Sequence, residues 1–427
     1  MDTIFALATA QGRAGVAVIR ISGPQAFDCA TALCSTLPKP RQAGVRALLD
    51  GDGSLLDQAL VLAFQGPHSF TGEDVVELHL HGSIAVVSAV LRRLGEGPAR
   101  LAEPGEFTRR ALENDKMDLA QVEGLGDLIA SETEGQRRQA QRIFEGALGE
   151  RIEAWRADLI RAAALIEVTI DFADEDVPVD VSPEVRSLLQ SVRADVEKEL
   201  NGFAAAERIR TGFEVAIIGP PNAGKSTLLN ALAKRDAAIT SERAGTTRDV
   251  IEVRMDLDGY AVTLLDTAGL RDSADEIEAT GIERAMSRAH AADLRIFLKE
   301  PDEIVRVPFQ DGDIQMAPKA DVRSDDAPAV SGKSGQGIPE LISAVSQALS
   351  AKTATAGLVT HARHRDAMQA SLVALDVAME RIGHGPDHYD IAAEEIRTSI
   401  RSLESLVGRI GVENLLDEIF SSFCLGK

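Results

Sequence analysis

Hydrophobic and polar positions divide the chain into segments of different periodicity. Residues 1–114 alternate short apolar runs with turn residues, which is the pattern of strands joined by short connections. The runs that predict β-strands lie at residues 16–21, 58–64 and 75–80. Helical patterns accompany them, as in residues 84–94, where apolar positions recur at helical spacing. The pattern therefore predicts an N-terminal α/β domain over residues 1–114.

A helical period replaces the strand pattern from about residue 115 to 208 and returns over residues 358–427. The apolar positions at this spacing are Ile143, Ala147, Ile152, Trp155, Leu159 and Ile166 in the first segment, and Ile396, Ile400, Leu403, Val407 and Ile410 in the second. An acidic stretch at 171–178 separates two helices of the first segment. We expect both segments to pack together as one helical domain, with residues 212–353 inserted between them at nearby entry and exit points.

The inserted segment carries a phosphate-binding signature. Residues 219–226 read GPPNAGKS, which matches the pattern G-x-x-x-x-G-K-[ST]. An apolar run at 213–218 predicts a buried strand before it, and residues 226–232 predict the start of a helix after it. A glycine-rich turn in this place aims backbone N–H groups and a helix N-terminus at phosphates. We therefore expect Lys225 to reach the outer phosphates and the Ser226 hydroxyl to bind Mg²⁺.

Two further motifs follow at the spacing of a nucleotide switch. Residues 244–249 read AGTTRD, and residues 266–269, at the end of the predicted strand 261–266, read DTAG. In phosphate-switch proteins a loop threonine completes the Mg²⁺ shell, an Asp at a strand end holds a metal-bound water, and a following Gly donates its N–H to the γ-phosphate. The residues that fit these roles are Thr247, Asp266 and Gly269. With these motifs the chain resembles the translation-factor-like class of small GTPases.

The guanine-recognition motif Asn-Lys-x-Asp is altered. Lys319 and Asp321 stand at the expected positions, but Pro318 replaces the Asn. Because proline has no side-chain amide and no backbone N–H, we expect the loss of a contact to the base and of a brace to the phosphate loop. Residues 330–334 read VSGKS and resemble the Ser-Ala-Lys loop that covers the base, with Gly332 in place of Ala. GTP remains the expected nucleotide, with weaker affinity or laxer selectivity.

Composition narrows the class of protein. The chain has 427 residues, enough for roughly two to four domains. It has no uninterrupted apolar run of membrane-spanning length, and its first residues lack the pattern of an export signal. Three cysteines (Cys29, Cys34 and Cys424) form no disulfide framework, which suits a reducing cytosol. We expect a soluble cytoplasmic protein without a membrane partner.

The charge balance bears on nucleic-acid binding. The net charge is −22 and aromatic residues make up 4% of the chain. A protein that holds RNA alone usually shows a basic face or aromatic side chains on which bases stack. If RNA is the substrate, we expect much of the electrostatic attraction to come from a partner.

Motifs outside the inserted segment point to a particular family. They read DTIFALAT at 2–9, VIRISGP at 18–24, SFTGED at 69–74, ELHLHG at 77–82, EPGEFT at 103–108, NDKMDLAQ at 114–121 and FSSFCLGK at 420–427. Together they resemble the MnmE (TrmE) family of tRNA uridine-modification GTPases from end to end. The resemblance implies a homodimer built from an N-terminal folate-binding domain, a central helical domain and an inserted Ras-like P-loop GTPase domain. The corresponding ranges are 1–114, 115–208 with 358–427, and 212–353.

The resemblance also implies an activity. Family members act with a flavoprotein of the MnmG (GidA) type in a heterotetramer, and FAD is bound only by that partner. The pair adds an aminomethyl or carboxymethylaminomethyl group to carbon 5 of the wobble uridine in tRNA. The one-carbon bridge comes from a methylene-tetrahydrofolate, and a formyl-tetrahydrofolate is an equivalent ligand. Open points are which tRNAs are substrates, whether glycine or ammonium is the amine donor, and how tRNA contacts divide between the partners.

The family's folate residues match Arg20, Glu77, Lys116 and Lys427. A carboxylate suits the hydrogen-bond donor edge of a pterin, and cations suit the glutamate tail of folate. Taken without the family, Arg20 and Glu77 are better explained as solvated strand residues, and Lys116 as an ordinary helix-start cation. Cys424 is either a reactive thiol beside the folate or a small buried side chain in a tail that only docks.

GTP hydrolysis requires a catalytic mechanism different from that of Ras-like proteins, because Leu270 occupies the position of their catalytic Gln. The resemblance implies that K⁺ takes the place of an arginine finger. An arginine finger raises the rate of hydrolysis by roughly 10³–10⁵. The matching potassium ligands are Asn222, Ser241, Arg243 and Thr246, the second and third through backbone carbonyls. Glu278 matches the glutamate that positions the attacking water through another water. The switch loops are expected to close when two GTPase domains meet across the dimer.

These considerations give one set of candidate residues. The residues expected to bind GTP are Asn222, Ala223, Gly224, Lys225, Ser226, Thr227, Ser241, Thr246, Thr247, Asp266, Thr267, Ala268, Gly269, Lys319, Asp321, Ser331 and Lys333. Those expected to act in catalysis are Glu278, Asn222, Lys225 and Cys424.

Two other function classes are alternatives. The first is an Era/Der-like regulatory GTPase in ribosome assembly, which would append a KH-type RNA-binding domain. The second is a folate-dependent one-carbon transferase that acts alone, which would lack the GTPase segment.

Overall fold

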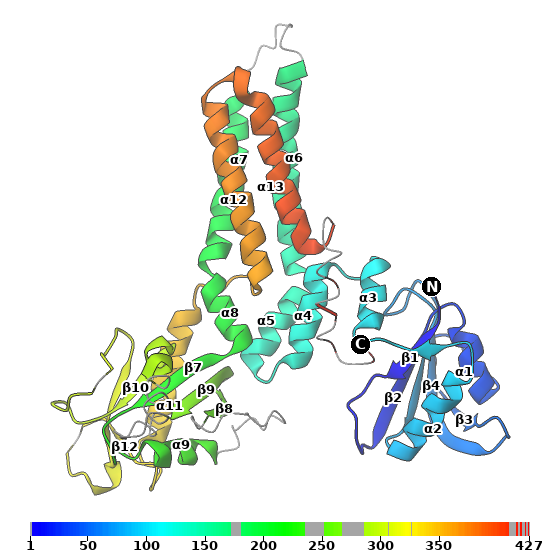
Figure 1. Ribbon diagram of the computed structural model, residues 1–427, viewed down its shortest axis with the longest axis horizontal. Helices are drawn as coiled ribbons and strands as arrows, with labels where there is room; N and C mark the ends of the chain where they lie inside the picture. The colour runs from blue at the N-terminus through cyan, green and yellow to red at the C-terminus, as the bar shows by residue number, and fades with distance from the viewer. Residues whose placement is uncertain are drawn as a thin grey trace, which may run out of the picture. The chain divides into compact units, whose positions relative to one another are not determined.

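The computed structural model describes residues 2–171, 181–234, 252–266, 286–305, 307–325 and 327–409, together with positions 416, 419, 420, 423 and 426. The chain forms two compact units. One comprises residues 1–126 with 404–427, and the other comprises residues 127–403. Figure 1 shows the elements of both. Within the described part of the chain, no helix is long and apolar enough to span a membrane.

The first unit is built on a six-stranded sheet with the order β3-β4-β5-β2-β1-β6. Its strands are β1 (Ile4–Leu7), β2 (Val16–Ser22), β3 (Gly44–Leu49), β4 (Leu55–Phe64), β5 (Val75–His81) and β6 (Arg100–Leu101). Neighbouring strands are antiparallel except β1 and β6. The three strands predicted from the apolar runs are therefore confirmed as β2, β4 and β5.

Alternation along β2 divides the sheet into two faces. Ile19 and Ile21 are buried beneath α1 (Ala26–Cys34) and α2 (Ile84–Gly95), which cover one face. On the other face Ile4 and Ala6 of β1 pack with Phe107 of α3 (Glu106–Glu113). Because successive strand residues point to opposite faces, Arg20 lies on this second face.

The helical part of the second unit comes from both ends of the chain. Its helices are α5 (Glu134–Phe144), α6 (Ala147–Asp171), α7 (Ser182–Asn201), α8 (Phe203–Thr211), α12 (Ala362–Gly383) and α13 (Tyr389–Glu404), and α4 (Leu119–Ala130) leads into them. Helices α6, α7, α12 and α13 run side by side (Figure 1). The predicted apolar stripe of α6 is buried, and the Ser371 and Ser399 hydroxyls join α12 to α13 at 2.8 Å. The two helical segments therefore pack together as expected.

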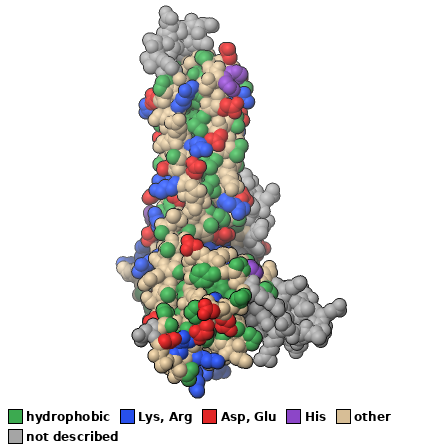
Figure 2. All heavy atoms as spheres, turned by 90° about the vertical axis from the view of Figure 1, so that its left-hand side faces the viewer, with side chains coloured by type: hydrophobic (Ala, Val, Ile, Leu, Met, Phe, Trp, Pro, Cys, Tyr) green, Lys and Arg blue, Asp and Glu red, His purple; other side chains and the backbone are tan. Residues whose placement is uncertain are grey.

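Charges of both signs are interspersed along this bundle on the face that Figure 2 shows. Many of them are paired, as in the ion pairs Arg193–Asp376 and Arg161–Glu184. On this face the basic side chains are not gathered into a single stripe, which agrees with the weak RNA-binding signal of the sequence.

The inserted segment folds around a second six-stranded sheet with the order β12-β11-β10-β7-β9-β8. Its strands are β7 (Phe213–Ile218), β8 (Glu252–Leu257), β9 (Tyr260–Asp266), β10 (Leu294–Leu298), β11 (Ile314–Pro318) and β12 (Ala329–Val330). All pairs are parallel except β8 with β9. Helices α9 (Lys225–Ala233) and α11 (Ile338–Thr353) pack on one face of this sheet.

The β8–β9 hairpin is attached to the N-terminal end of α5. The Gly135 N–H donates to the Gly259 carbonyl at 3.0 Å, and Arg254 pairs with Glu132 at 2.7 Å. The entry and exit of the inserted segment also lie together, because Arg210 Nε donates to the Thr360 carbonyl at 3.0 Å. Residues that flank the inserted segment on either side are therefore in contact.

Candidate functional site

The turn from β7 to α9 has the backbone of a phosphate-binding loop. Asn222 and Gly224 have φ values of +62° and +88°, a conformation that Asn and Gly adopt more readily than other residues. A Cβ on Gly219 would collide with the Leu298 carbonyl, so glycine is required where the loop leaves β7. Gly224 is the N-cap of α9, which places the free N–H groups of the helix at the loop.

Lys225 lies inside this loop. Its ammonium donates to the carbonyls of Gly219 and Pro220 at 2.8 and 3.0 Å, and the residue is 8% exposed. Burial lowers the pKa of Lys225 from its ordinary value near 10.5, and the Asp266 carboxylate partly offsets this effect. Asp266 is itself buried at the end of β9. The ammonium of Lys225 and the carboxylate of Asp266 therefore lie close together at one edge of the sheet.

A pocket of about 360 Å³ connects this loop with the altered guanine motif. The predicted nucleotide residues that line it are Asn222, Ala223, Gly224, Thr227, Lys319, Asp321, Ser331 and Lys333. Ser331 Oγ accepts the N–H groups of Lys333 and Ser334 at 3.2 and 3.3 Å. A hydrogen bond with Ser331 lowers the pKa of Asp321. The structure thus brings the phosphate loop and the base-recognition residues into one pocket.

Several predicted residues lie outside the described residues. They are Ser241, Arg243, Thr246, Thr247, Thr267, Ala268, Gly269, Glu278, Cys424 and Lys427. Their roles stay predictions from the sequence.

A second polar site lies on the sheet face of the first unit that carries Arg20. Arg20 Nε donates to Glu77 Oε1 at 3.0 Å, since β2 and β5 place these residues opposite each other. The guanidinium lies over the rings of Phe70 and Phe107, at 5.0 and 5.7 Å from their centroids. His79 Nε2 is 3.4 Å from Glu77 Oε2. The face therefore combines a carboxylate, a cation and two aromatic rings.

Lys116 lies against the loop that carries Phe70. A Cβ on Gly72 would be 3.1 Å from Lys116 Cε and 2.9 Å from Asn114 Cβ. Asn114 Nδ2 also donates to the Thr71 carbonyl at 2.7 Å. The loop 70–72 thus contacts Lys116 on one side and Arg20 on the other, so three of the four predicted folate residues share one region.

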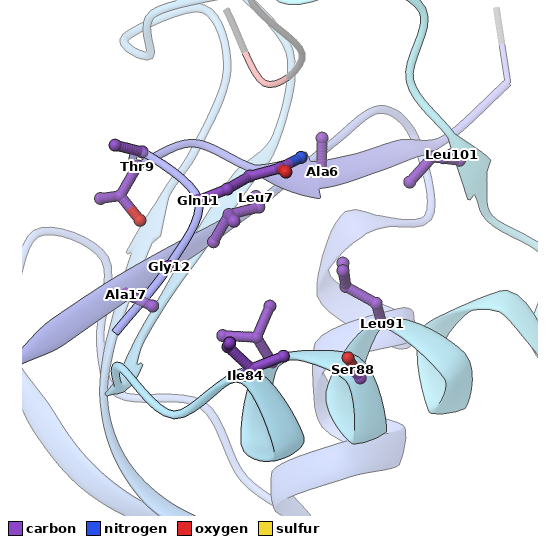
Figure 3. Close-up of a pocket in the computed structure, with 12 residues that line it drawn as sticks. Ala6, Leu7, Thr9, Gln11, Gly12, Ala17, Ile84, Ser88, Leu91 and Leu101 are labelled. Atoms are coloured by element: carbon purple, nitrogen blue, oxygen red, sulfur yellow. The ribbon is translucent and has the colours of Figure 1, made fainter. Parts of the chain in front are cut away.

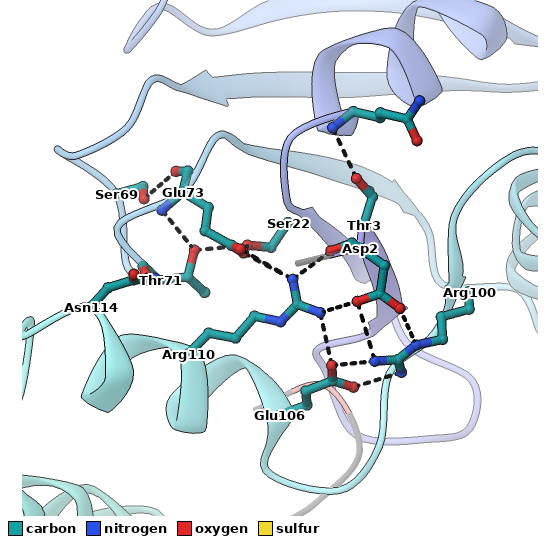
Figure 4. A network of polar contacts seen from close by, with 11 residues as sticks. Asp2, Thr3, Ser22, Ser69, Thr71, Glu73, Arg100, Glu106, Arg110 and Asn114 are labelled. Carbon is teal, nitrogen blue, oxygen red and sulfur yellow. Dashed lines mark hydrogen bonds and ion pairs between the residues drawn. The ribbon is translucent and has the colours of Figure 1, made fainter.

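A buried ion network supports this loop, and the sequence analysis did not find it. Arg110 is 4% exposed and bonds to Asp2 at 2.9 Å, Glu73 at 3.2 Å and Glu106 at 2.8 Å (Figure 4). Arg100 bonds to Asp2 and Glu106, each at 2.6 Å. Burial would raise the pKa of Glu106, but hydrogen bonds from Arg100 and Arg110 leave it below its ordinary value. The only sequence signal was the spacing of Glu106 and Arg110 by four residues.

The C-terminal tail packs against the same unit. Phe420 contacts Gly105, and its ring lies 5.1 Å from the Arg109 guanidinium. Gly426 lies against Leu7, so closely that a Cβ there would collide with the Leu7 carbonyl. Leu7 belongs to β1, which pairs with the strand that carries Arg20.

A largely apolar pocket of about 640 Å³ lies on the opposite face of the N-terminal sheet, and the sequence analysis did not find it either. Figure 3 shows Ile84, Ser88 and Leu91 of α2 facing the end of β1, with Leu101 of β6 on the strand side of the pocket. Ile84 and Leu101 are 60% and 54% exposed. Their apolar surface is available to a ligand or to another protein surface.

These features define a class of protein: a P-loop GTPase domain is inserted into a helical domain that follows an N-terminal α/β domain. Residues 3–116 match the family model "GTP-binding protein TrmE N-terminus", and residues 119–424 match "MnmE helical domain". The chain is 64% identical to the tRNA modification GTPase MnmE of Roseobacter denitrificans and 63% identical to that of Ruegeria pomeroyi, with all of each chain covered. The chain belongs to the MnmE (TrmE) family of tRNA modification GTPases, and it is a GTP hydrolase.

A solved structure of an Era variant from Aquifex aeolicus is also similar, at 23% identity. The match covers 32% of this chain and 56% of that one, with a TM-score of 0.25, which is too low to carry an argument. Membership of the MnmE family decides against the Era/Der-like alternative and against a transferase without a GTPase domain.

Proposed function

We propose that this chain couples GTP hydrolysis to modification of the wobble uridine of tRNA at carbon 5, with a flavin-bearing partner of the MnmG type. The added group is aminomethyl or carboxymethylaminomethyl, and tetrahydrofolate supplies its one-carbon unit. One observation carries this proposal: a single chain combines a phosphate loop around a buried lysine with a carboxylate–guanidinium pair beside aromatic rings. The first arrangement suits a nucleoside triphosphate, and the second suits a pterin.

In the nucleotide site Lys225 neutralises the outer phosphates, and Asp321 accepts hydrogen bonds from the base. Oxygen ligands are those that Mg²⁺ prefers, and the buried Asp266 carboxylate lies at the edge where they are needed. Ser226 and Thr247 would hold the ion, whose chemistry is to neutralise charge on the phosphates. Asn222 offers an amide oxygen from within the phosphate loop, which fits K⁺. The ion would add positive charge beside the phosphates, and Glu278 would position water.

In the folate site Glu77 accepts hydrogen bonds from the pterin, and the partly exposed Phe70 ring lies beside it. The hydrogen bond from Arg20 orients the Glu77 carboxylate. Lys116 and Lys427 would bind the glutamate tail. The contact of Gly426 with Leu7 supports a tail that ends beside β1 of the N-terminal sheet.

We further infer a cytoplasmic homodimer with three domains per chain, over residues 1–114, 115–208 with 358–427, and 212–353. The exposed apolar pocket beside α2 offers surface for the contact between N-terminal domains. Two such chains and two flavoprotein chains form a heterotetramer that acts on tRNA, and much of the positive surface for tRNA belongs to the flavoprotein.

The decisive experiment is GTP hydrolysis by the purified chain in K⁺ and in Na⁺, with ATP as the nucleotide control. A large rise in K⁺ that is selective for GTP is expected. Equal slow rates in both salts would refute stimulation of hydrolysis by K⁺. Similar rates with GTP and ATP would refute selectivity for guanine. Omission of the flavoprotein from a reaction with tRNA, GTP and methylene-tetrahydrofolate must abolish modification but leave GTP hydrolysis.

A further inference from the structure

The loop after β12 lies directly on the backbone of α9. A Cβ on Gly332 would be 2.5 Å from the Leu228 nitrogen and 2.6 Å from the carbonyl carbon and oxygen of Thr227. These atoms cannot move aside cheaply, because the Leu228 N–H bonds to the Gly224 carbonyl at 2.8 Å and so closes the first turn of the helix. At this position only glycine fits without a shift of the loop.

The same loop controls the position of the base-recognition carboxylate. Ser331 precedes Gly332, is buried, and caps the N–H groups of Lys333 and Ser334. Asp321 is exposed and lines the same pocket, and an interaction with the Ser331 hydroxyl lowers its pKa. The α9 backbone, Gly332, Ser331 and Asp321 therefore lie in succession along one side of the nucleotide pocket.

Pro318 removes the contact that the guanine motif would otherwise make with the phosphate loop. Pro318 ends β11, one residue before Lys319, which has a φ of +59°. The Asn of the guanine motif would brace this point to the phosphate loop through its amide, whereas the proline ring has no donor or acceptor in its side chain. The base-recognition segment must therefore be tied to the phosphate loop by another contact.

We propose that Gly332 determines nucleotide affinity and base selectivity in this chain, because its backbone packing on α9 replaces the brace that Pro318 cannot supply. The proposal rests on the nucleotide site proposed above. An alanine at 332 has to move its Cβ from 2.5 Å to at least 3.4 Å from the Leu228 nitrogen, so the loop shifts by about 1 Å. A shift of about that size takes a hydrogen bond of normal length out of range.

The test is a double-mutant cycle with Gly332→Ala and Pro318→Asn, read out as the dissociation constants of fluorescent GDP and ATP analogues. Gly332→Ala is expected to weaken GDP binding about tenfold or more and to narrow the GDP-over-ATP preference. In the Pro318→Asn background the same substitution is expected to cost less than about threefold. Gly383→Ala is the matched control, since a Cβ there meets nothing within 4 Å.

Several outcomes would overturn the proposal. One is an unchanged GDP affinity in Gly332→Ala, and another is an equal loss in both backgrounds. Pro318→Asn alone leaves Gly332 unchanged, so it is informative even if the alanine variant folds poorly. The Pro318→Asn variant is expected to change GDP affinity less than about threefold. A tenfold gain in GDP affinity would show that Gly332 does not compensate for the missing Asn side chain.

The Asp321→Asn variant tests separately whether the nucleotide site has been assigned correctly. An amide at this position can donate to the 2-oxo group of xanthine, so preference is expected to move from guanine to xanthine nucleotides. If guanine preference persists, the assignment of the base site is wrong. If preference moves as expected and the Gly332 cycle shows no coupling, only the compensation proposal is wrong.

Discussion

Replacement of Arg110 by Met tests whether the buried ion network holds the N-terminal unit together. The substitution keeps the apolar stem but leaves three carboxylates without their shared cation. Removal of one partner from a buried ion pair costs about 3–5 kcal/mol. Asp2 is half-exposed and, like Glu106, keeps its bond to Arg100, and Glu73 keeps the Ser22 hydroxyl at 2.7 Å, so the lower end of this range applies.

The assay is thermal unfolding followed by circular dichroism and calorimetry. A loss of about 3 kcal/mol lowers Tm by roughly 6–12 °C for a domain of 150–250 residues. Arg92→Met is the control, because Arg92 is an exposed partner of Asp50 and such surface pairs contribute about 0–1 kcal/mol. A Tm within 2 °C of the parent protein for Arg110→Met would refute the reasoning.

The pH dependence provides a second check. The pKa values of Asp2 and Glu106 are lowered from their ordinary values of 3.8 and 4.5 in the folded protein, for Asp2 chiefly by the hydrogen bond from Arg100. Hydrogen bonds from Arg110 contribute to the lowering in both carboxyls. Carboxyls with lowered pKa values stabilise the fold fully above their unfolded pKa, and this contribution is lost as the pH falls through the folded pKa. The difference in Tm between parent and Arg110→Met should therefore shrink from pH 6 toward pH 3. A constant difference over that range would show that packing, not charge, causes the effect.

Three other outcomes follow from the geometry. Lys225→Ala should abolish GTP hydrolysis and weaken nucleotide binding about 100-fold or more, measured with a fluorescent GDP analogue, because the loop loses its buried cation. Glu77→Gln should weaken binding of formyl-tetrahydrofolate about tenfold or more in calorimetry and leave GTP hydrolysis unchanged. Arg295→Met should destabilise the protein by about 3–5 kcal/mol in urea unfolding, because Asp313 is left unpaired in the interior, whereas Arg193→Met should cost less than about 1 kcal/mol.

Local patterns predicted the elements well where one residue period dominates. Strand β7, strand β9 and the buried stripe around Trp155 follow from apolar spacing, and the phosphate loop follows from its glycines and lysine. The resemblance to a family assigned Arg20 and Glu77 to one site, but their direct pairing was not predicted. No spacing rule relates residues 57 positions apart on two strands.

The sequence by itself predicted the strands at 16–21, 58–64, 75–80 and 213–218, the helical segments and a nucleotide-binding segment over residues 212–353, and it showed which family motifs are present. Only the tertiary structure decided that Arg110 gathers three carboxylates, that an apolar pocket lies beside α2, and that Gly332 lies against α9. The physical reason is that helix and strand periods are set by neighbours a few residues apart. Ion networks, pockets and close backbone contacts depend instead on which distant segments the fold brings together.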